Sequence, residues 1–199
     1  MTSKEVINYL KTKISEDVSV VCSLGRTSQE VYNILPYQTL FLDSMGDIVS
    51  VSCGIALGLE SHPVIALDTD GSNLMGITIL SCISAMKEEL KNLSILVLNN
   101  RILESGGGME TTLKDPKWEY LGKAWDINVI EINNLNDFKI NFETLAFKEL
   151  TYFIINVDNS KIPQYDSTKS IDGIESKYIF TRHIENIKKE KFIKPCIKN

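Results

Sequence analysis

Two polar segments that could carry chemistry stand about thirty residues apart in this chain of 199 residues. Asp70-Gly71-Ser72 follows an apolar run at residues 64–67, and Asn99-Asn100 follows a second apolar run at residues 93–98. Because ligands bind beyond the carboxyl ends of strands in open α/β sheets, we expect a carboxylate and a carboxamide to meet there. Mg²⁺ prefers oxygen ligands of this kind, completed by phosphate oxygens and water. The spacing predicts a divalent-cation site and the diphosphate that such a cation holds.

The residues between the two predicted ligands favour the same site. Gly71 lets the backbone approach a ligand closely. Ser72 is expected to cap a helix that starts near Asn73, and the free N–H groups of that first turn suit a phosphate. Taken alone, the Asp-Gly-Ser tripeptide also fits an ordinary turn followed by a helix cap, because such turns are common.

Apolar, β-branched runs alternate with longer helix-like stretches along the chain. We expect strands at residues 18–22, 39–42, 64–68, 93–98, 128–132 and 152–157, and helices at residues 3–14, 28–34, 48–59, 74–91, 117–125, 137–148 and 175–190. Continuous apolar strands are typical of parallel sheets covered on both faces. The alternation predicts a doubly wound α/β fold with a mostly parallel sheet of about six strands. Residues 1–199 are expected to form one domain, in which 158–199 are a connection, a last helix and a tail.

Composition excludes several other classes of protein. The net charge of −5 and the pI near 5.2 argue against a nucleic-acid surface. No apolar run approaches the roughly 20 residues of a membrane helix, and the first residues do not resemble a signal peptide. We therefore expect a cytoplasmic protein that binds neither membrane nor nucleic acid, with reduced and mostly buried thiols at Cys22, Cys53, Cys82 and Cys196. With two histidines in the chain, neither a His-based metal site nor a Ser/His/Asp triad is expected.

The pairing of the two polar segments resembles the cofactor motif of the thiamine diphosphate-dependent enzymes. That motif is Gly-Asp-Gly, followed further along the chain by Asn-Asn. In the family, the Asp, the second Asn and a carbonyl two residues later bind the Mg²⁺ on the diphosphate. The resemblance assigns these roles to Asp70, Asn100 and the carbonyl of Ile102, with thiamine diphosphate and Mg²⁺ as cofactors.

Three further segments are similar to those of the sulfopyruvate and phosphonopyruvate decarboxylases of this family. They are residues 42–46 (Leu-Asp-Ser-Met-Gly) with the small-residue helix at 53–59, residues 20–30 with their Gly-Arg-Thr-Ser-Gln-Glu loop, and residues 103–108 (Leu-Glu-Ser-Gly-Gly-Gly). The match covers roughly residues 5–160. It most resembles the separate β subunits, which carry the pyrophosphate-binding domain.

These segments imply roles for further residues, and each of these residues also has a simpler structural interpretation. Met45, next to Ser44, matches the bulky residue that props the cofactor in its bent shape, but a core Met is the alternative. Gly25 and Thr27 would lie beside the diphosphate, or would form an ordinary turn and N-cap.

Three residues of these segments are candidates for contact with the substrate. Glu104 and Ser105 are candidate substrate residues, and an exposed, solvated Glu104 is the alternative. Arg26 is expected at the surface, with an anionic substrate group or the diphosphate as its alternative partner.

The sequence departs from the family pattern at two positions. Thr69 replaces the first Gly of the motif, and a β-branched residue does not readily take the φ values that a Gly allows. Either the loop tolerates ordinary φ or the cofactor geometry is altered. Arg101 stands where relatives often have Gly, and the spacing from Asp70 to Asn100 is slightly long.

The resemblance implies the β subunit of a two-subunit decarboxylase that acts on a small anionic 2-oxo acid. The Glu that activates the cofactor belongs to the pyrimidine-binding domain, so it is expected on an α subunit of similar size in a hetero-oligomer. The catalytic residue of this chain itself is unknown. Three alternatives stay open: a carboligase or acyl-transfer subunit that uses the same cofactor, a non-catalytic subunit that retains the fold, and a flavodoxin-like phosphate-binding module.

Overall fold

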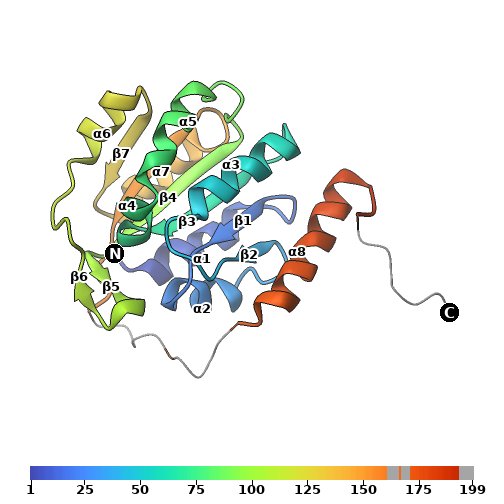
Figure 1. Ribbon diagram of the computed structural model, residues 1–199, viewed down its shortest axis with the longest axis horizontal. Coiled ribbons are helices and arrows are strands. Elements are labelled where there is room, and N and C mark those ends of the chain that lie inside the picture. The colour runs from blue at the N-terminus through green and yellow to red at the C-terminus, as the bar shows by residue number, and fades with distance from the viewer. Residues whose placement is uncertain (161–165, 167–170, 193–199) are drawn as a thin grey trace.

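Six parallel strands form the central sheet of the computed structural model, which describes residues 1–160, 166 and 171–192. The strands are β1 (Ser19–Cys22), β2 (Thr39–Phe41), β3 (Val64–Thr69), β4 (Leu93–Asn99), β7 (Asn128–Ile132) and β8 (Thr151–Asn156). Their order is β2-β1-β3-β4-β8-β7, and every neighbouring pair is parallel (Figure 1). The predicted α/β fold is confirmed.

Helices cover both faces of this sheet. The helical elements are α1 (Ser3–Lys13), α2 (Arg26–Tyr32), α3 (Ile48–Leu59), α4 (Asp70–Met75), η1 (Ile77–Ile79), α5 (Leu80–Ala85), η2 (Glu104–Gly106), α6 (Trp118–Trp125), α7 (Leu135–Leu145) and α8 (Gly173–Lys188). Side chains of α1, α2 and α7 pack against one face, and those of α3, α5 and α6 pack against the other. Helix α8 lies along β2 at the edge of the sheet (Figure 1).

The strands read as continuous apolar runs because both of their faces are buried. In β3, Ile65 and Leu67 belong to the core on the α1 and α7 side, whereas Val64 and Ala66 belong to the core on the α3 side. Successive side chains of a strand point to opposite faces, so each face needs its own apolar set. This double burial holds the ends of β1, β3 and β4 at one edge.

The helix expected over residues 74–91 is wrong. The chain forms the short helix α4, the 3₁₀ turn η1 and the short helix α5, and then turns through residues 86–92. A Cβ on Gly76 would lie 2.0 Å from the carbonyl oxygen of Gly46, so the chain must pass this point with glycine. The β-branched residues that follow, Ile77 to Ile79, also have modest helix propensity.

A two-stranded hairpin near the same edge was not predicted. Strands β5 (Ile102–Leu103) and β6 (Met109–Glu110) pair antiparallel, and Gly107 and Gly108 between them have φ of +87° and +79°. Strands of two residues are too short to show an alternating pattern. The glycine run was therefore the one sequence signal of this turn.

Two further expectations concern buried thiols and membrane-spanning helices. Cys22 and Cys53 are buried, Cys82 is exposed, and Cys196 lies outside the described residues. Within the described part of the chain, every helix is too short or too polar to cross a membrane.

Candidate functional site

Asp70 and Asn100 meet at the carboxyl edge of the sheet. Asp70 directly follows β3 and begins α4, and Asn100 directly follows β4, the neighbouring parallel strand. The backbone N–H of Asn100 donates to Asp70 Oδ1 at 3.2 Å. Asp70 is 1% exposed, and this burial raises the pKa of its carboxyl while the hydrogen bond from Asn100 opposes the rise. The two predicted ligands therefore lie in direct contact.

The two adjacent asparagines point to different neighbours. Asn99 donates through Nδ2 to Asn156 Oδ1 at 2.6 Å and thereby joins β4 to β8. Asn100 instead accepts a hydrogen bond at Oδ1 from the N–H of Ile102, at 3.1 Å. The side chain of the first asparagine joins two strands, and that of the second bonds within the loop that follows β4.

The loop after β1 lies at the point where the strand order reverses. From β1 the chain continues to β2 on one side, while β3 pairs with β1 on the other. Such a switch point is where α/β sheets bind ligands. Gly25 has φ +92° there, and a Cβ on it would meet nothing within 4 Å. Thr27 is buried in the first turn of α2, and Ser28 Oγ donates to the Gly25 carbonyl at 2.6 Å.

Ser72 does not cap the helix as expected. Helix α4 begins at Asp70 with Thr69 as its N-cap, and no side chain caps it. Ser72 is buried inside the helix, where its Oγ accepts a hydrogen bond from the N–H of Gly46 at 3.1 Å. The serine therefore ties α4 to the loop that contains Met45.

The loop before α3 places its two predicted cofactor residues differently. Ser44 is exposed and donates to Asp47 Oδ2 at 2.7 Å. Met45 is half-buried. Gly46 has φ +87° and packs against Gly76, so the loop is held close to the end of α4.

Gly71 lies directly against the hairpin. A Cβ at this position would lie 2.3 Å from Leu103 Cδ2 and 3.2 Å from Thr111 Cγ2. The structure thus brings β5 and the residue after β6 close to Gly71, whereas the close approach of a ligand stays a prediction. The hairpin thus packs directly on the first turn of α4.

Glu104 and Arg26 are both less exposed than expected. Their side chains are 17% and 6% exposed, and Arg26 Nη2 donates to Glu104 Oε1 in an ion pair. Asn100 Nδ2 donates to the same carboxylate oxygen at 3.3 Å. Burial raises the pKa of Glu104, and the Arg26 charge opposes the rise. The solvated Glu104 and the surface Arg26 are thus both corrected, and the side chain of Ser105 lies outside the described residues.

The comparisons with known proteins agree with this geometry. Residues 22–146 match the family model described as "Thiamine pyrophosphate enzyme, C-terminal TPP binding domain". This chain belongs to the thiamine pyrophosphate enzymes. The assignment removes the flavodoxin-like alternative.

Individual thiamine pyrophosphate enzymes resemble the chain over different lengths. Sulfopyruvate decarboxylase subunit beta of Methanocaldococcus jannaschii is 29% identical over 91% of this chain and 96% of its own length. Phosphonopyruvate decarboxylase of Streptomyces viridochromogenes is 34% identical over 53% of this chain and 26% of its own. The thiamine diphosphate-dependent 4-hydroxybenzoylformate decarboxylase of Rhodococcus jostii shares the fold, with a TM-score of 0.68 at 18% identity. That match covers 79% of this chain and 33% of the solved one.

The oxygen atoms at the carboxyl edge fit the metal diphosphate of a thiamine pyrophosphate enzyme. Asp70 supplies a carboxylate, and Asn100 Oδ1 keeps a second lone pair beside the one that accepts from Ile102. Among the residues that the structure describes, no group of three His, Cys, Asp or Glu side chains could hold a metal ion. A cation here would therefore need the amide, a backbone carbonyl and the diphosphate, all hard oxygen ligands.

Sequence reasoning missed Asp68, the buried carboxyl closest in sequence to the predicted ligand. It lies in β3, is 1% exposed, and accepts a hydrogen bond from the N–H of Thr69 at 2.9 Å. Burial raises its pKa to about 6. An acidic residue at the end of an otherwise apolar strand was the available signal, because buried carboxylates are rare without a partner or a function.

Proposed function

We propose that this chain is the β subunit of a two-subunit decarboxylase that depends on thiamine diphosphate and Mg²⁺. Its substrate is a small anionic 2-oxo acid of the sulfopyruvate or phosphonopyruvate type. The contact between Asp70 and Asn100 at the carboxyl edge of the sheet carries the proposal. A relative named as a beta subunit, matched over 96% of its length, supports the subunit assignment.

Different predicted site residues would hold different parts of the cofactor. Asp70, Asn100 and the carbonyl of Ile102 would bind Mg²⁺ and, through it, the diphosphate. Gly25 and Ser44 of the loops, Thr27 of α2, and Gly71 and Ser72 of α4 would surround the diphosphate, and Met45 would support the bent cofactor. When bound, the cofactor supplies the electron sink for loss of CO₂. Glu104 and Ser105 stay predicted substrate residues.

The departure at Thr69 does not argue against this function. Thr69 has φ −115° and ψ 158°, an extended conformation that any residue adopts. The loop therefore tolerates ordinary φ. Arg101 instead takes φ +63°, which a Gly would adopt at lower cost. The backbone at Thr69 is therefore no reason to prefer a subunit that only retains the fold.

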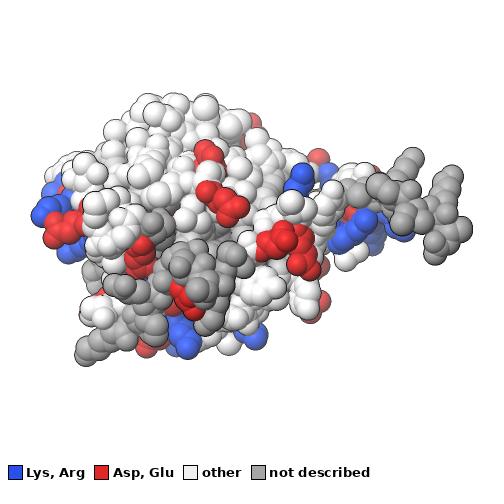
Figure 2. All heavy atoms as spheres, turned by 60° about the horizontal axis from the view of Figure 1, so that its bottom comes forward, with Lys and Arg blue, Asp and Glu red and all other residues white. Residues whose placement is uncertain are grey.

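An α subunit of similar size would supply the activating Glu and complete the hetero-oligomer. Helix α3 has no charged residue from Ile48 to Leu59. Apolar side chains nearby in the fold are exposed, with Leu57 of α3 at 39% and Met75 of α4 at 59%. Figure 2 shows a wide area of one face without charged side chains. Exposed apolar side chains such as Leu57 and Met75 favour contact with another protein.

Co-expression with a candidate α subunit tests the proposal. The purified complex would be given thiamine diphosphate, Mg²⁺ and a panel of 2-oxo acids, with and without an aldehyde. We expect CO₂ from the 2-oxo acid alone, fastest with sulfopyruvate or phosphonopyruvate. A product formed only with aldehyde would favour the carboligase, and a complex that binds no cofactor would favour the non-catalytic subunit.

A further inference from the structure

We propose that Glu104, held by Arg26, is a positioning residue that fixes the orientation of the Asn100 amide for the metal ion. The inference rests on the proposed function, since it assumes that Asn100 binds Mg²⁺ through Oδ1. Neither Glu104 nor Arg26 belongs to the predicted ligand set of Asp70, Asn100 and the Ile102 carbonyl.

Hydrogen bonds on both sides of the Asn100 amide select one orientation. Nδ2 donates to Glu104 Oε1 at 3.3 Å, and Oδ1 accepts from the N–H of Ile102 at 3.1 Å. A half-turn of the amide would place Oδ1 against the Glu104 carboxylate and Nδ2 against an N–H donor. Both contacts would then be repulsive, because a carboxylate only accepts and an N–H only donates. The side chain is therefore locked with its oxygen away from Glu104.

Arg26 makes Glu104 a fixed acceptor. Its guanidinium binds the same Oε1 atom that accepts from Asn100, and both side chains of the ion pair are largely buried. A hydrogen bond to a charged acceptor is stronger than one to a neutral acceptor, so the carboxylate discriminates better between the two amide orientations. Without Arg26, the largely buried Glu104 carboxylate would lack the positive charge that compensates it.

The three residues come from three different connections at the carboxyl edge. Arg26 follows Gly25 after β1, Asn100 follows β4, and Glu104 follows β5. The ion pair therefore links the loop beside the predicted diphosphate site to the metal-ligand loop. Residues that hydrogen-bond to a metal ligand orient that ligand, and their loss typically weakens metal binding by about 10–100-fold.

Calorimetry on the co-expressed complex tests the role of Glu104. Mg²⁺ would be titrated in the presence of thiamine diphosphate, and we expect Glu104→Ala to weaken Mg²⁺ binding by about 10-fold or more. Glu104→Gln should lose less, because its amide oxygen still accepts from Asn100. Arg26→Met should fall between wild type and Glu104→Ala. Glu110→Ala, which breaks an exposed pair with Lys114 on the same hairpin, should bind as wild type does.

A double-mutant cycle separates positioning from a general structural role. If Glu104 acts through Asn100, then Glu104→Ala in an Asn100→Ala background should weaken Mg²⁺ binding little further. An equal loss in both backgrounds, or wild-type affinity in Glu104→Ala with an unchanged melting temperature, would overturn the inference alone. A wild-type complex that binds thiamine diphosphate without Mg²⁺, or not at all, would instead overturn the proposed function.

Discussion

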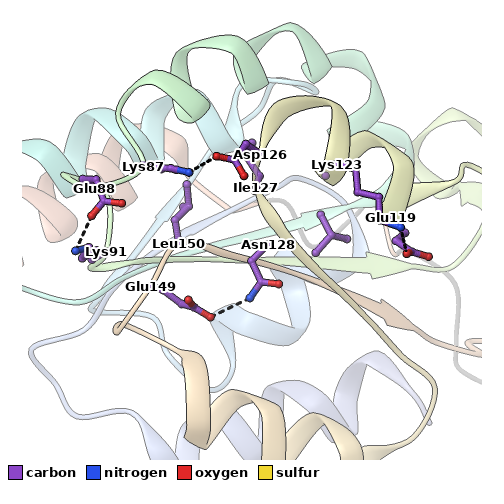
Figure 3. Close-up of a pocket in the computed structure, with 12 residues that line it drawn as sticks. Lys87, Glu88, Lys91, Glu119, Lys123, Asp126, Ile127, Asn128, Glu149 and Leu150 are labelled. Atoms are coloured by element: carbon purple, nitrogen blue, oxygen red, sulfur yellow. Dashed lines mark hydrogen bonds and ion pairs between the residues drawn. The ribbon is translucent and has the colours of Figure 1, made fainter.

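Charged side chains meet at both edges of the sheet, but the amino edge leaves them in water whereas the carboxyl edge buries them. At the amino edge, a hollow of about 520 Å³ lies beside α6 and the start of β7 (Figure 3). It contains the ion pairs Lys87–Asp126, Lys91–Glu88 and Lys123–Glu119, whose side chains are all at least 38% exposed. At the carboxyl edge, Arg26 and Glu104 are 6% and 17% exposed.

The two edges also differ in how their charged side chains are compensated. Exposed pairs contribute little to stability, and each lysine of the hollow pairs with its own carboxylate, while Glu149 accepts a hydrogen bond from the neutral Asn128 amide. At the carboxyl edge, one carboxylate oxygen of Glu104 serves two donors, and Asp70 is buried. Burying such groups is costly, and their retention at this edge supports the proposed cofactor site.

The substitution with the largest expected effect is that of Asp70. Asp70→Asn removes the carboxylate charge, and we expect Mg²⁺-dependent binding of thiamine diphosphate to the assembled complex to weaken by more than about 100-fold. Loss of a residue that hydrogen-bonds to a metal ligand weakens metal binding by about 10–100-fold. Loss of the ligand itself should weaken metal binding more. Isothermal titration calorimetry would measure the affinity.

Asp126→Asn at the amino edge is the matched control. It breaks the pair with Lys87 and should leave cofactor binding unchanged. Equal affinity of Asp70→Asn and wild type would contradict the metal-ligand assignment and remove the functional difference between the two edges.

The second effect is on stability. Arg26→Met leaves Glu104 largely buried without its cation, and we expect the free energy of unfolding to fall by about 2–3 kcal/mol, below the range for fully buried pairs. Lys87→Met, at the exposed pair, should unfold as wild type does. Urea unfolding followed by circular dichroism measures both. Equal midpoints for the two variants would mean that burial does not distinguish the edges.

A third effect concerns the glycines that hold the Met45 loop near α4. Gly76→Ala places a Cβ 2.0 Å from the Gly46 carbonyl oxygen, so the backbone must shift, at a cost of about 1–3 kcal/mol. Gly54→Ala in α3 meets nothing within 4 Å and should be neutral or stabilising. Thermal unfolding of both variants would measure the difference, and a wild-type melting temperature for Gly76→Ala would show that the loop is not held there.

Sequence patterns predicted the sheet well because its strands are apolar on both faces. They predicted the neighbourhood of Asp70 and Asn100 because parallel strands end at a common edge. They failed where tertiary contacts decide the structure. The approach of Gly46 to Gly76 breaks a helix that looked continuous. The pairing of Arg26 with Glu104 joins residues 78 positions apart, which no local pattern contains.

The smallest expected effect is a pH dependence that belongs to the amino edge. His183 Nε2 lies 3.0 Å from Ser19 Oγ, at the first residue of β1. Burial lowers the pKa of His183 below its ordinary value, and Asp17 opposes this. The folded chain therefore binds the proton less tightly than the unfolded chain does. The stability that the neutral imidazole contributes is complete above the ordinary pKa and is lost as the pH falls through the lowered one.

His183→Gln removes this titration and retains a group that can hydrogen-bond to Ser19. We expect its melting temperature to fall less than that of wild type between pH 7 and pH 5. His62→Gln, at a half-buried histidine near the Leu59 carbonyl, controls for the loss of a histidine in general. Cofactor binding should be unaffected in His183→Gln, because the change lies at the edge opposite Asp70. A weakened affinity for thiamine diphosphate in this variant would mean that the two edges of the sheet are coupled and that their division of roles is incomplete.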